Sequence, residues 1–249
     1  MRLYYDNCGT QEYVNYDAKL NNKIDPTTVI FFHGMWSSTL STKAQFIKRF
    51  CEEYNINYIL FDYFGHGQSS GNFDDLTFEK ALNSCFAVIN ELVIDKCIIV
   101  GSSFGCWLAT HVALMRSDKV KGLILVAPAI DFTTFLLHGH QGFELDKNGD
   151  LLRYSETAGT LIIRKKYLDS AENYLLADGD KIINLDIPVC FLQGTADTSV
   201  PYELTIKLME KFSCKQMETC LVKNGKHSFS TEFCLNIIKE KILSFYNRE

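Results

Sequence analysis

The chain has 249 residues, and 47% of them are hydrophobic, which is enough for one α/β domain with a large core. Its formal net charge of −5 argues against a nucleic-acid-binding surface, which is normally basic. The composition therefore predicts a single globular domain over residues 1–249 with no nucleic-acid partner.

Cysteine usage and the absence of long apolar runs bear on location. The nine cysteines are scattered, no CxxC pair occurs, and an odd count without a signal peptide is typical of reduced thiols. No uninterrupted apolar stretch reaches the roughly 18 residues that span a bilayer. We therefore expect a soluble, cytoplasmic protein without stable membrane insertion.

Short apolar runs alternate with amphipathic stretches through most of the chain. Continuous apolar runs indicate strands buried on both faces of a parallel sheet, and apolar residues at helical spacing indicate helices. This alternation predicts an α/β fold, with a mostly parallel central sheet and helices on both faces. We expect a hairpin from 2–5 and 11–18, and strands at 28–32, 57–61, 96–100, 120–126, 189–193 and 218–222. We expect one helix that is capped by Ser41 or Thr42, and three further helices over 76–93, 104–115 and 229–246.

The rhythm changes between the strands at 120–126 and 189–193. Residues 131–187 contain turn-forming stretches with short helical segments between them, and they are too many for a plain loop. We expect a small cap inserted between two late strands. Its apolar side chains either line an acyl pocket or pack the cap itself. They are Phe132, Phe135, Leu136, Leu137, Phe143, Leu151, Leu152, Leu161, Ile162, Ile163, Tyr167 and Tyr174.

The strand at 96–100 runs directly into Gly101-Ser102-Ser103-Phe104-Gly105, and a helical pattern follows. A Gly-x-Ser-x-Gly pentapeptide alone arises by chance in many chains. Between a strand and a helix it is typical of a nucleophile elbow, in which a tight turn lifts the serine hydroxyl clear at the strand end. Ser103 has the required spacing to the two glycines and is the candidate nucleophile, with Ser102 as second choice.

A serine nucleophile needs a base, and the base needs a carboxylate that orients it. His227 directly follows the last predicted strand, at the edge of the sheet where such a base belongs. Asp197 follows the preceding strand, in a loop expected beside that of His227. Asp131, past the strand at 120–126, is the alternative acid. We expect Ser103, Asp197 and His227 to meet at the carboxyl ends of three strands.

The tetrahedral oxyanion of an acyl transfer needs N–H donors aimed at the developing charge. Phe104 opens the helix after Ser103, so its N–H also has the helix dipole behind it. Met35 follows the strand at 28–32 and its turn. We predict that these two backbone N–H groups form the oxyanion hole.

Other polar residues have structural roles in this interpretation. We expect His111 to be a packing or surface residue on its helix, and the cap residues His138 and His140 are weaker candidates for the base. The residues expected to brace their own loops are His33, Asp62, His66 and Ser69. No HExxH, paired-cysteine spacing or glycine-rich phosphate loop occurs, so we predict neither a metal nor a cofactor.

Taken together, these motifs resemble the α/β-hydrolase superfamily across nearly the whole chain. The resemblance implies the α/β-hydrolase fold and a serine hydrolase with Ser103, Asp197 and His227 as its triad. The motifs are His33-Gly34, Asp62-x-x-Gly65-His66-Gly67-x-Ser69, Gly101-x-Ser103-x-Gly105, Asp197-x-x-Val200-Pro201 and Gly225-x-His227.

A narrower set of residues is similar to the abhydrolase-domain palmitoyl-protein thioesterases, also described as mycophenolic acid acyl-glucuronide esterases. This resemblance implies cleavage of an acyl thioester or ester in a small-molecule or acylated-protein substrate. Cys106 replaces a glycine and Gln193 replaces a histidine of that family, and we expect neither to touch the triad. The matching residues are Gly34, Thr42-Lys43-Ala44, Phe61-Asp62-Tyr63, Gly101-Ser102-Ser103-x-Gly105-x-Trp107-Leu108-Ala109 and Ala127-Pro128-Ala129-x-Asp131-Phe132.

The sequence leaves other functions open. One is a catalytically silent hydrolase-fold protein whose cap clasps a ligand or a partner, and another is a carbon–carbon bond hydrolase or perhydrolase on the same triad. Arg164-Lys165-Lys166 either meets an anionic leaving group or is a solvated surface run.

Overall fold

A computed structural model describes residues 1–137, 142–155 and 159–248, so the candidates His138 and His140 lie outside the described residues. The described residues form an eight-stranded sheet in the order β1-β2-β4-β3-β5-β6-β10-β11. The first two pairings are antiparallel and the others are parallel. In chain order the strands are β1 (Arg2–Asn7), β2 (Thr10–Lys19), β3 (Thr28–Phe32), β4 (Asn57–Phe61), β5 (Cys97–Ser102), β6 (Val120–Val126), β10 (Ile183–Gly194) and β11 (Phe212–Val222).

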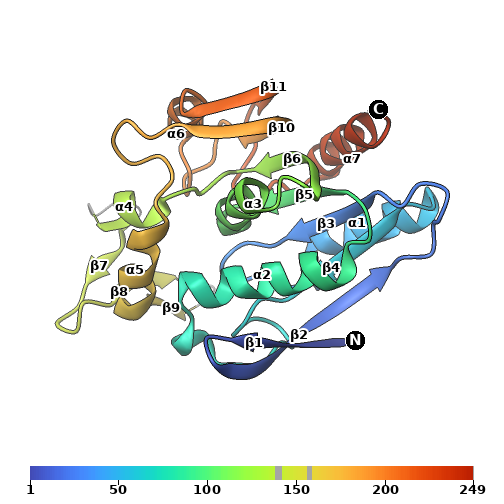
Figure 1. Cartoon of the computed structure of the whole chain (residues 1–249). Helices are drawn as coiled ribbons and strands as arrows, with labels where there is room; N and C mark the ends of the chain where they lie inside the picture. Colours follow the sequence, from blue (N-terminus) through green and yellow to red (C-terminus); the bar gives the residue numbers. More distant parts are fainter. Residues whose placement is uncertain (138–141, 156–158, 249) are drawn as a thin grey trace.

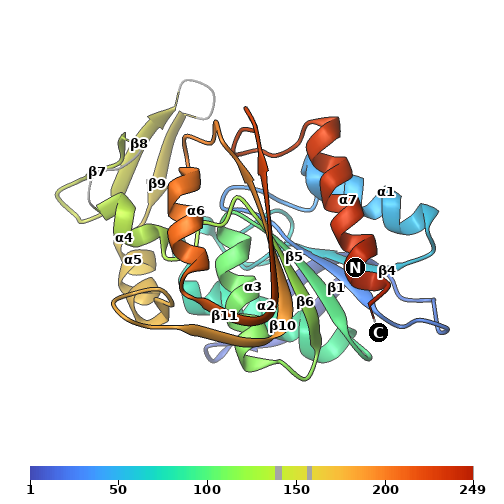
Figure 2. The same cartoon turned by 90° about the horizontal axis from the view of Figure 1, so that it is seen from above.

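Helices cover both faces of this sheet, as predicted (Figures 1 and 2). On one face lie α1 (Thr42–Glu53) and α7 (Glu232–Tyr246). On the other lie α2 (Phe78–Leu92), α3 (Phe104–Met115) and α6 (Tyr202–Met209). A short 3₁₀ turn, η1 (Phe73–Asp75), precedes α2.

The inner strand β3 is buried at every residue because successive side chains point to opposite faces and both faces are covered. In β3, Ile30 and Phe32 belong to the core cluster under α2 and α3. Their neighbours Val29 and Phe31 belong to the cluster under α1 and α7. All four are at most 2% exposed.

Most predicted elements are confirmed, with differences at their ends. The hairpin and the strands at 28–32, 57–61 and 120–126 lie where the pattern placed them, and Ser41 caps α1. The two last strands are longer than predicted, and β10 begins at Ile183 because the polar residues between its apolar ones are also paired with β11. The short helix α6 was missed, and α7 starts at Glu232 because Thr231 caps it.

The segment between β6 and β10, here called the insertion, holds more than the short helices expected from the sequence. Its described elements are α4 (Phe132–Leu137), β7 (Glu144–Leu145), β8 (Leu151–Ser155), β9 (Gly159–Ile163), α5 (Lys165–Ala171) and the 3₁₀ turn η3 (Glu172–Tyr174). The strands β7, β8 and β9 form a separate antiparallel sheet, which the sequence analysis missed. Figure 1 shows this sheet standing beside one end of the main sheet.

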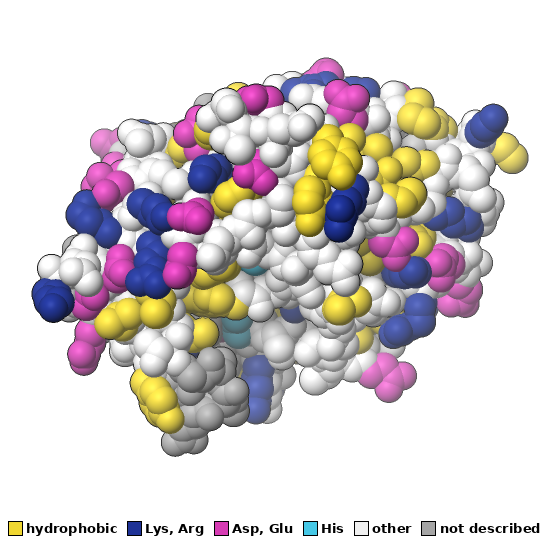
Figure 3. Space-filling view, turned by 90° about the horizontal axis from the view of Figure 1, so that it is seen from below, with side chains coloured by type: hydrophobic (Ala, Val, Ile, Leu, Met, Phe, Trp, Pro, Cys, Tyr) yellow, Lys and Arg dark blue, Asp and Glu magenta, His cyan; other side chains and the backbone are white. Residues whose placement is uncertain are grey.

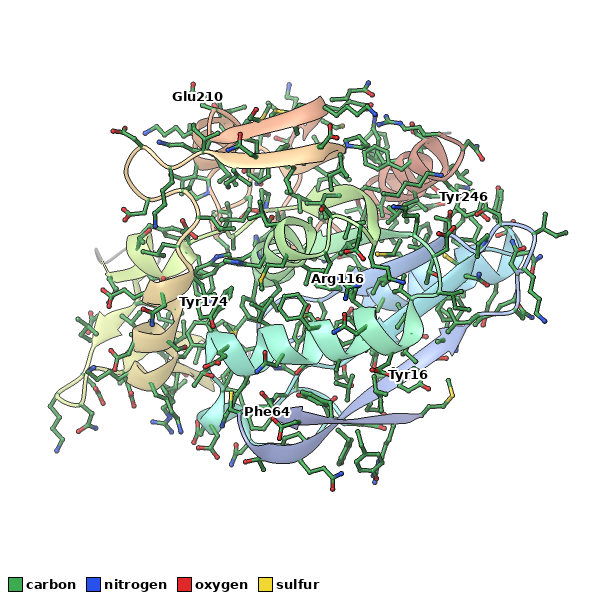
Figure 4. The ribbon with its side chains drawn as sticks, viewed as in Figure 1. Tyr16, Phe64, Arg116, Tyr174, Glu210 and Tyr246 are labelled. Carbon is green, nitrogen blue, oxygen red and sulfur yellow. The ribbon has the colours of Figure 1, made fainter. Side chains whose placement is uncertain are left out.

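The insertion is fixed to the core by the carbonyl oxygen of Tyr174, labelled in Figure 4. Trp107 Nε1 donates to this oxygen at 3.0 Å, and His111 Nε2 lies 2.8 Å from it. The Tyr174 ring stacks on Phe78 of α2 with centroids 4.8 Å apart. His111 is therefore a packing residue, as predicted, and it joins α3 to the insertion.

Gly105 allows α3 to approach β3 closely. A Cβ at this position would overlap the carbonyl group of Phe32. We predict that Gly105→Ala lowers the free energy of unfolding by about 1–3 kcal/mol, because helix and strand must move apart. Urea unfolding followed by circular dichroism measures the change.

Gly9→Ala is the matched control for that substitution. Its Cβ would meet nothing within 4 Å, but the residue has φ +81, so we expect a loss of about 1 kcal/mol from the backbone alone. Equal losses in the two variants would contradict the close-approach argument.

Candidate active site

Ser103 occupies a strained turn between β5 and α3. Its φ of 55° lies in the left-handed region that non-glycine residues rarely adopt. A Cβ on Gly101 would lie 2.8 Å from Cys106 Cα, and one on Gly105 would overlap the Phe32 carbonyl. The two glycines thus let the chain turn tightly enough to present the serine at the strand end, as a nucleophile elbow requires.

The structure brings the three predicted residues together. His227 Nε2 lies 3.0 Å from Ser103 Oγ, and His227 Nδ1 lies 2.8 Å from Asp197 Oδ2. The three residues directly follow β5, β10 and β11 or stand in the loops after them. This arrangement suits proton transfer from the serine to the imidazole, with the carboxylate holding the ring.

Donors surround the buried Asp197 carboxylate. The backbone N–H groups of Ser199 and Val200 each donate to Oδ1 at 2.8 Å, and Oδ2 accepts from His227. Burial favours the neutral form, but the hydrogen bonds from His227, Val200 and Gln193 outweigh it and hold the pKa of Asp197 below its usual range. The carboxylate is therefore ionised at neutral pH and able to stabilise an imidazolium.

Gln193 also touches this carboxylate, so the expectation that it stands apart from the triad is wrong. Its Nε2 lies 3.0 Å from Asp197 Oδ2 and from the carbonyl oxygen of Val200. Its Oε1 accepts a hydrogen bond from Thr205 Oγ1 at 2.9 Å, and the side chain is fully buried. The sequence holds no signal for this contact, because it depends on how the side chain at the end of β10 turns beneath the loop that follows.

Gly34 lies directly against the nucleophile. A Cβ at Gly34 would stand 3.4 Å from Ser103 Cβ, so the next residue, Met35, starts the turn beside the serine. Phe104 is the first residue of α3, where backbone N–H groups have no acceptor inside the helix. Their roles as oxyanion donors stay predictions, and these positions are compatible with them.

The alternative candidates have other partners. The carboxylate of Asp131 accepts from Leu176 N at 2.9 Å and from Ala177 N at 2.6 Å, so it holds the end of the insertion. Ser102 is buried within β5. His227 pairs with Asp197 and not with Asp131.

The loop-bracing residues behave as expected. Asp62 Oδ1 accepts from Thr39 N at 2.7 Å, and Ser69 Oγ donates to the Asp62 carbonyl at 2.5 Å. Burial lowers the pKa of His33 to about 4 and that of His66 to about 3, so both rings are neutral at pH 7. Neutral buried rings of this kind support the turn at the nucleophile and take no part in proton transfer.

Lys43 contacts the loop of the candidate base. This residue of α1 donates through Nζ to the carbonyl oxygen of Ser228, directly after His227. Burial lowers the pKa of Lys43 to about 8. The sequence analysis included Lys43 in a family motif but gave it no role, because only the fold places α1 against this loop.

A cavity of about 170 Å³ opens onto Ser103 and His227. In Figure 3 a histidine lies in a hollow beside hydrophobic side chains. The side chain of His227 is 31% exposed. The walls include the turns after β3 and β5 of the main sheet and parts of α4, β8 and β9 of the insertion. The lining residues are Met35, Trp36, Ser103, Phe104, Ala129, Phe132, Phe135, Leu136, Phe143, Arg153, Ile163, Ser199, Val200 and His227.

Neither a metal-binding cluster nor a membrane-spanning helix occurs within the described ranges. No group of three or more His, Cys, Asp or Glu side chains there is arranged to hold a metal ion. No helix in those ranges is both long enough and apolar enough to cross a bilayer.

Fold and elbow together define a class of protein. Residues 27–166 match the family model described as the alpha/beta hydrolase fold. The chain therefore belongs to the α/β-hydrolase family.

Relatives within this class include a cattle (Bos taurus) protein named palmitoyl-protein thioesterase ABHD10, mitochondrial, which is 31% identical over 205 residues. The match covers 80% of this chain and 66% of that relative, so the chain spans just under two thirds of its length. A solved structure of a putative hydrolase from Agrobacterium vitis S4 superposes with a TM-score of 0.92 at 27% identity, covering 99% of this chain and 98% of the other. Mouse alpha/beta hydrolase domain-containing protein 10 shares the fold, with a TM-score of 0.86 at 24% identity and coverage of 98% and 97%.

Gln193→Leu tests the buried amide beneath Asp197. The variant removes a donor from the carboxylate and leaves the Thr205 hydroxyl without its acceptor. A hydrogen bond to a charged group is worth about 1.5–3 kcal/mol, so we expect kcat to fall about 10- to 100-fold. Steady-state kinetics on a p-nitrophenyl ester give kcat and KM, and Gln216→Leu, an exposed position on β11, is the control. A kcat within about twofold of the unaltered protein would show that the amide does not position the acid.

Activity should also depend on the charge of Lys43. As the ammonium loses its proton above pH 8, its hydrogen bond to Ser228 weakens by about half, and kcat/KM should fall several-fold. The folded pKa lies below the ordinary 10.5, so the folded protein binds fewer protons between pH 8 and 10.5 and this group makes folding more favourable as the pH rises. If activity falls between pH 8 and 10.5, deprotonation of Lys43 has therefore not caused it by unfolding the protein.

Lys43→Arg stays charged throughout that range and should keep its activity to higher pH. Profiles of kcat/KM from pH 6 to 10 for both proteins provide the measurement. Superimposable profiles would rule out Lys43 as the source of the alkaline limb.

Proposed function

We propose that the protein is a serine hydrolase that cleaves carboxylic esters or acyl thioesters through an acyl-enzyme on Ser103. The observation that carries this proposal is the continuous path of hydrogen bonds from Ser103 through His227 to Asp197. Membership of the α/β-hydrolase family supports it.

In the proposed mechanism, Ser103 Oγ attacks the acyl carbon while His227 Nε2 takes the hydroxyl proton. The ionised Asp197 stabilises the imidazolium through Nδ1. The N–H groups of Met35 and Phe104 form the oxyanion hole and stabilise the tetrahedral intermediate. His227 then returns the proton to the leaving alcohol or thiol, and a water molecule repeats the sequence to release the acid.

The single domain over 1–249 and its cap are part of the same proposal. The proposed cap covers 131–187, and its last residues overlap the start of β10 at Ile183. Phe132, Leu136 and Phe143 of this segment form apolar walls beside the nucleophile. Such walls bind an acyl chain and exclude water from the acyl-enzyme.

The substrate class follows from the relatives only in outline. The cattle and human relatives are named palmitoyl-protein thioesterases, which supports an acyl thioester or ester, carried by a small molecule or by an acylated protein. Those names place the relatives in mitochondria, so the cytoplasmic location expected for this chain stays a prediction. No feature of the described site favours the binding-protein or carbon–carbon hydrolase alternatives.

Labelling and kinetics test the proposed nucleophile. A fluorophosphonate probe should label the unaltered protein at Ser103, and Ser103→Ala should lose labelling and about 10⁴-fold or more of p-nitrophenyl ester turnover. Peptide mass spectrometry identifies the labelled serine.

Ser102→Ala is the control, because this neighbour does not contact His227. It should keep the label. Absence of both labelling and ester turnover in the unaltered protein would refute the proposed function.

A further inference from the structure

Arg153 stands out in the wall of the cavity above Ser103. It shares this wall with apolar side chains, among them Phe132, Phe143 and Ile163. The described lining contains no Asp or Glu, and its titratable members are Arg153 and His227. Arg153 is therefore the permanently charged residue among the described lining residues.

The side chain of Arg153 faces inward because of the register of the small sheet. Leu151 and Arg153 lie two residues apart on β8 and so share a face, and Leu151 is only 1% exposed. Leu151 pairs with Ile163, which is 2% exposed and lines the cavity. Tyr154, on the opposite face, is 76% exposed. An arginine thus occupies a position that the strand pattern otherwise reserves for apolar residues.

Among the described residues, the group that contacts the guanidinium is an aromatic ring and not a carboxylate. Its central carbon lies 4.9 Å from the centroid of Phe143, a distance at which a cation–π contact is favourable. Within residues 1–137, 142–155 and 159–248, no carboxylate makes an ion pair with it. Nearby Arg164, in contrast, binds both Asp74 and Asp150.

A cation in an apolar wall costs free energy unless an anion balances it. Arginine presents a planar fork of N–H donors that matches a carboxylate in two parallel hydrogen bonds. The ring of Phe143 contacts the guanidinium inside the cavity. Because the cavity is small, a carboxylate bound there would share its space with the acyl group at Ser103.

We propose that Arg153 recognises a carboxylate on the substrate, so that the preferred substrates are anionic esters or thioesters. The inference rests on the proposed hydrolase function of Ser103. The carboxylate sits either on the acyl group or on the leaving group, and the recognition chemistry is the same in both cases.

Two pairs of matched probes distinguish these sources. For the acyl group, mono-4-nitrophenyl adipate is compared with its neutral methyl ester, 4-nitrophenyl methyl adipate. For the leaving group, the butyrate ester of 3-hydroxyphenylacetic acid is compared with that of the neutral amide, 3-hydroxyphenylacetamide. We expect kcat/KM to be about 10- to 100-fold higher for the anionic member of one pair, the range for a hydrogen-bonded charge pair.

Variants assign the preference to the guanidinium. Arg153→Gln should bring the anionic-to-neutral ratio close to 1, whereas Arg153→Lys should keep part of the preference. Lys147→Gln removes the same charge from the exposed turn before β8 and should leave the ratio unchanged. Equal turnover within both pairs by the unaltered protein, or a preference that survives Arg153→Gln, would overturn the proposal.

A binding measurement separates this proposal from the proposed catalysis. Monomethyl adipate is titrated calorimetrically into Ser103→Ala and into the double variant with Arg153→Gln. The dissociation constant should rise about tenfold or more in the double variant, and equal affinities would overturn the inference even if esters are hydrolysed. Arg153-dependent binding together with no ester turnover by the unaltered protein would refute only the proposed hydrolase function.

Discussion

The close approach of α3 to the end of β3 is the constraint on which the rest of the site depends. At Gly105 the helix backbone meets the carbonyl group of Phe32 with no room for a side chain. This contact holds Ser103 in a backbone conformation that a free chain would rarely adopt. It also fixes where the turn after β3 lies, so the same packing contact positions both Ser103 and the Gly34–Met35 turn.

Around this point the structure joins loops that are far apart in the sequence. Hydrogen bonds connect the turn after β10 to the loop after β11 through Asp197 and His227, and Lys43 attaches that second loop to α1. Gln193 supports the acid from beneath without titrating itself. Each candidate catalytic side chain is therefore oriented by a neighbour on another element, which is the condition for a preorganised site.

The sequence predicted the sheet and the positions of Ser103, Asp197 and His227 because strands buried on both faces give unbroken apolar runs and their ends converge. The sequence-based prediction failed where strands are buried on one face only, and where contacts depend only on tertiary structure. The described burial of β8 changes from buried Leu151 to exposed Tyr154 over four residues, too short a pattern to distinguish from a loop. The contact of Gln193 depends on how a side chain turns beneath its own loop, which no spacing reveals.

The course of the insertion has a consequence for how such proteins diverge. β6 and β10 are parallel neighbours, so the chain that leaves one at the carboxyl edge must return to the opposite edge before entering the other. The insertion makes this journey, with Tyr174 and the segment held by Asp131 as its fixed points along the way. Its outer hairpins can lengthen, shorten or change composition while the return path and the sheet register stay the same. The insertion residues that line the cavity thus lie on a different stretch of chain from Ser103, Asp197 and His227.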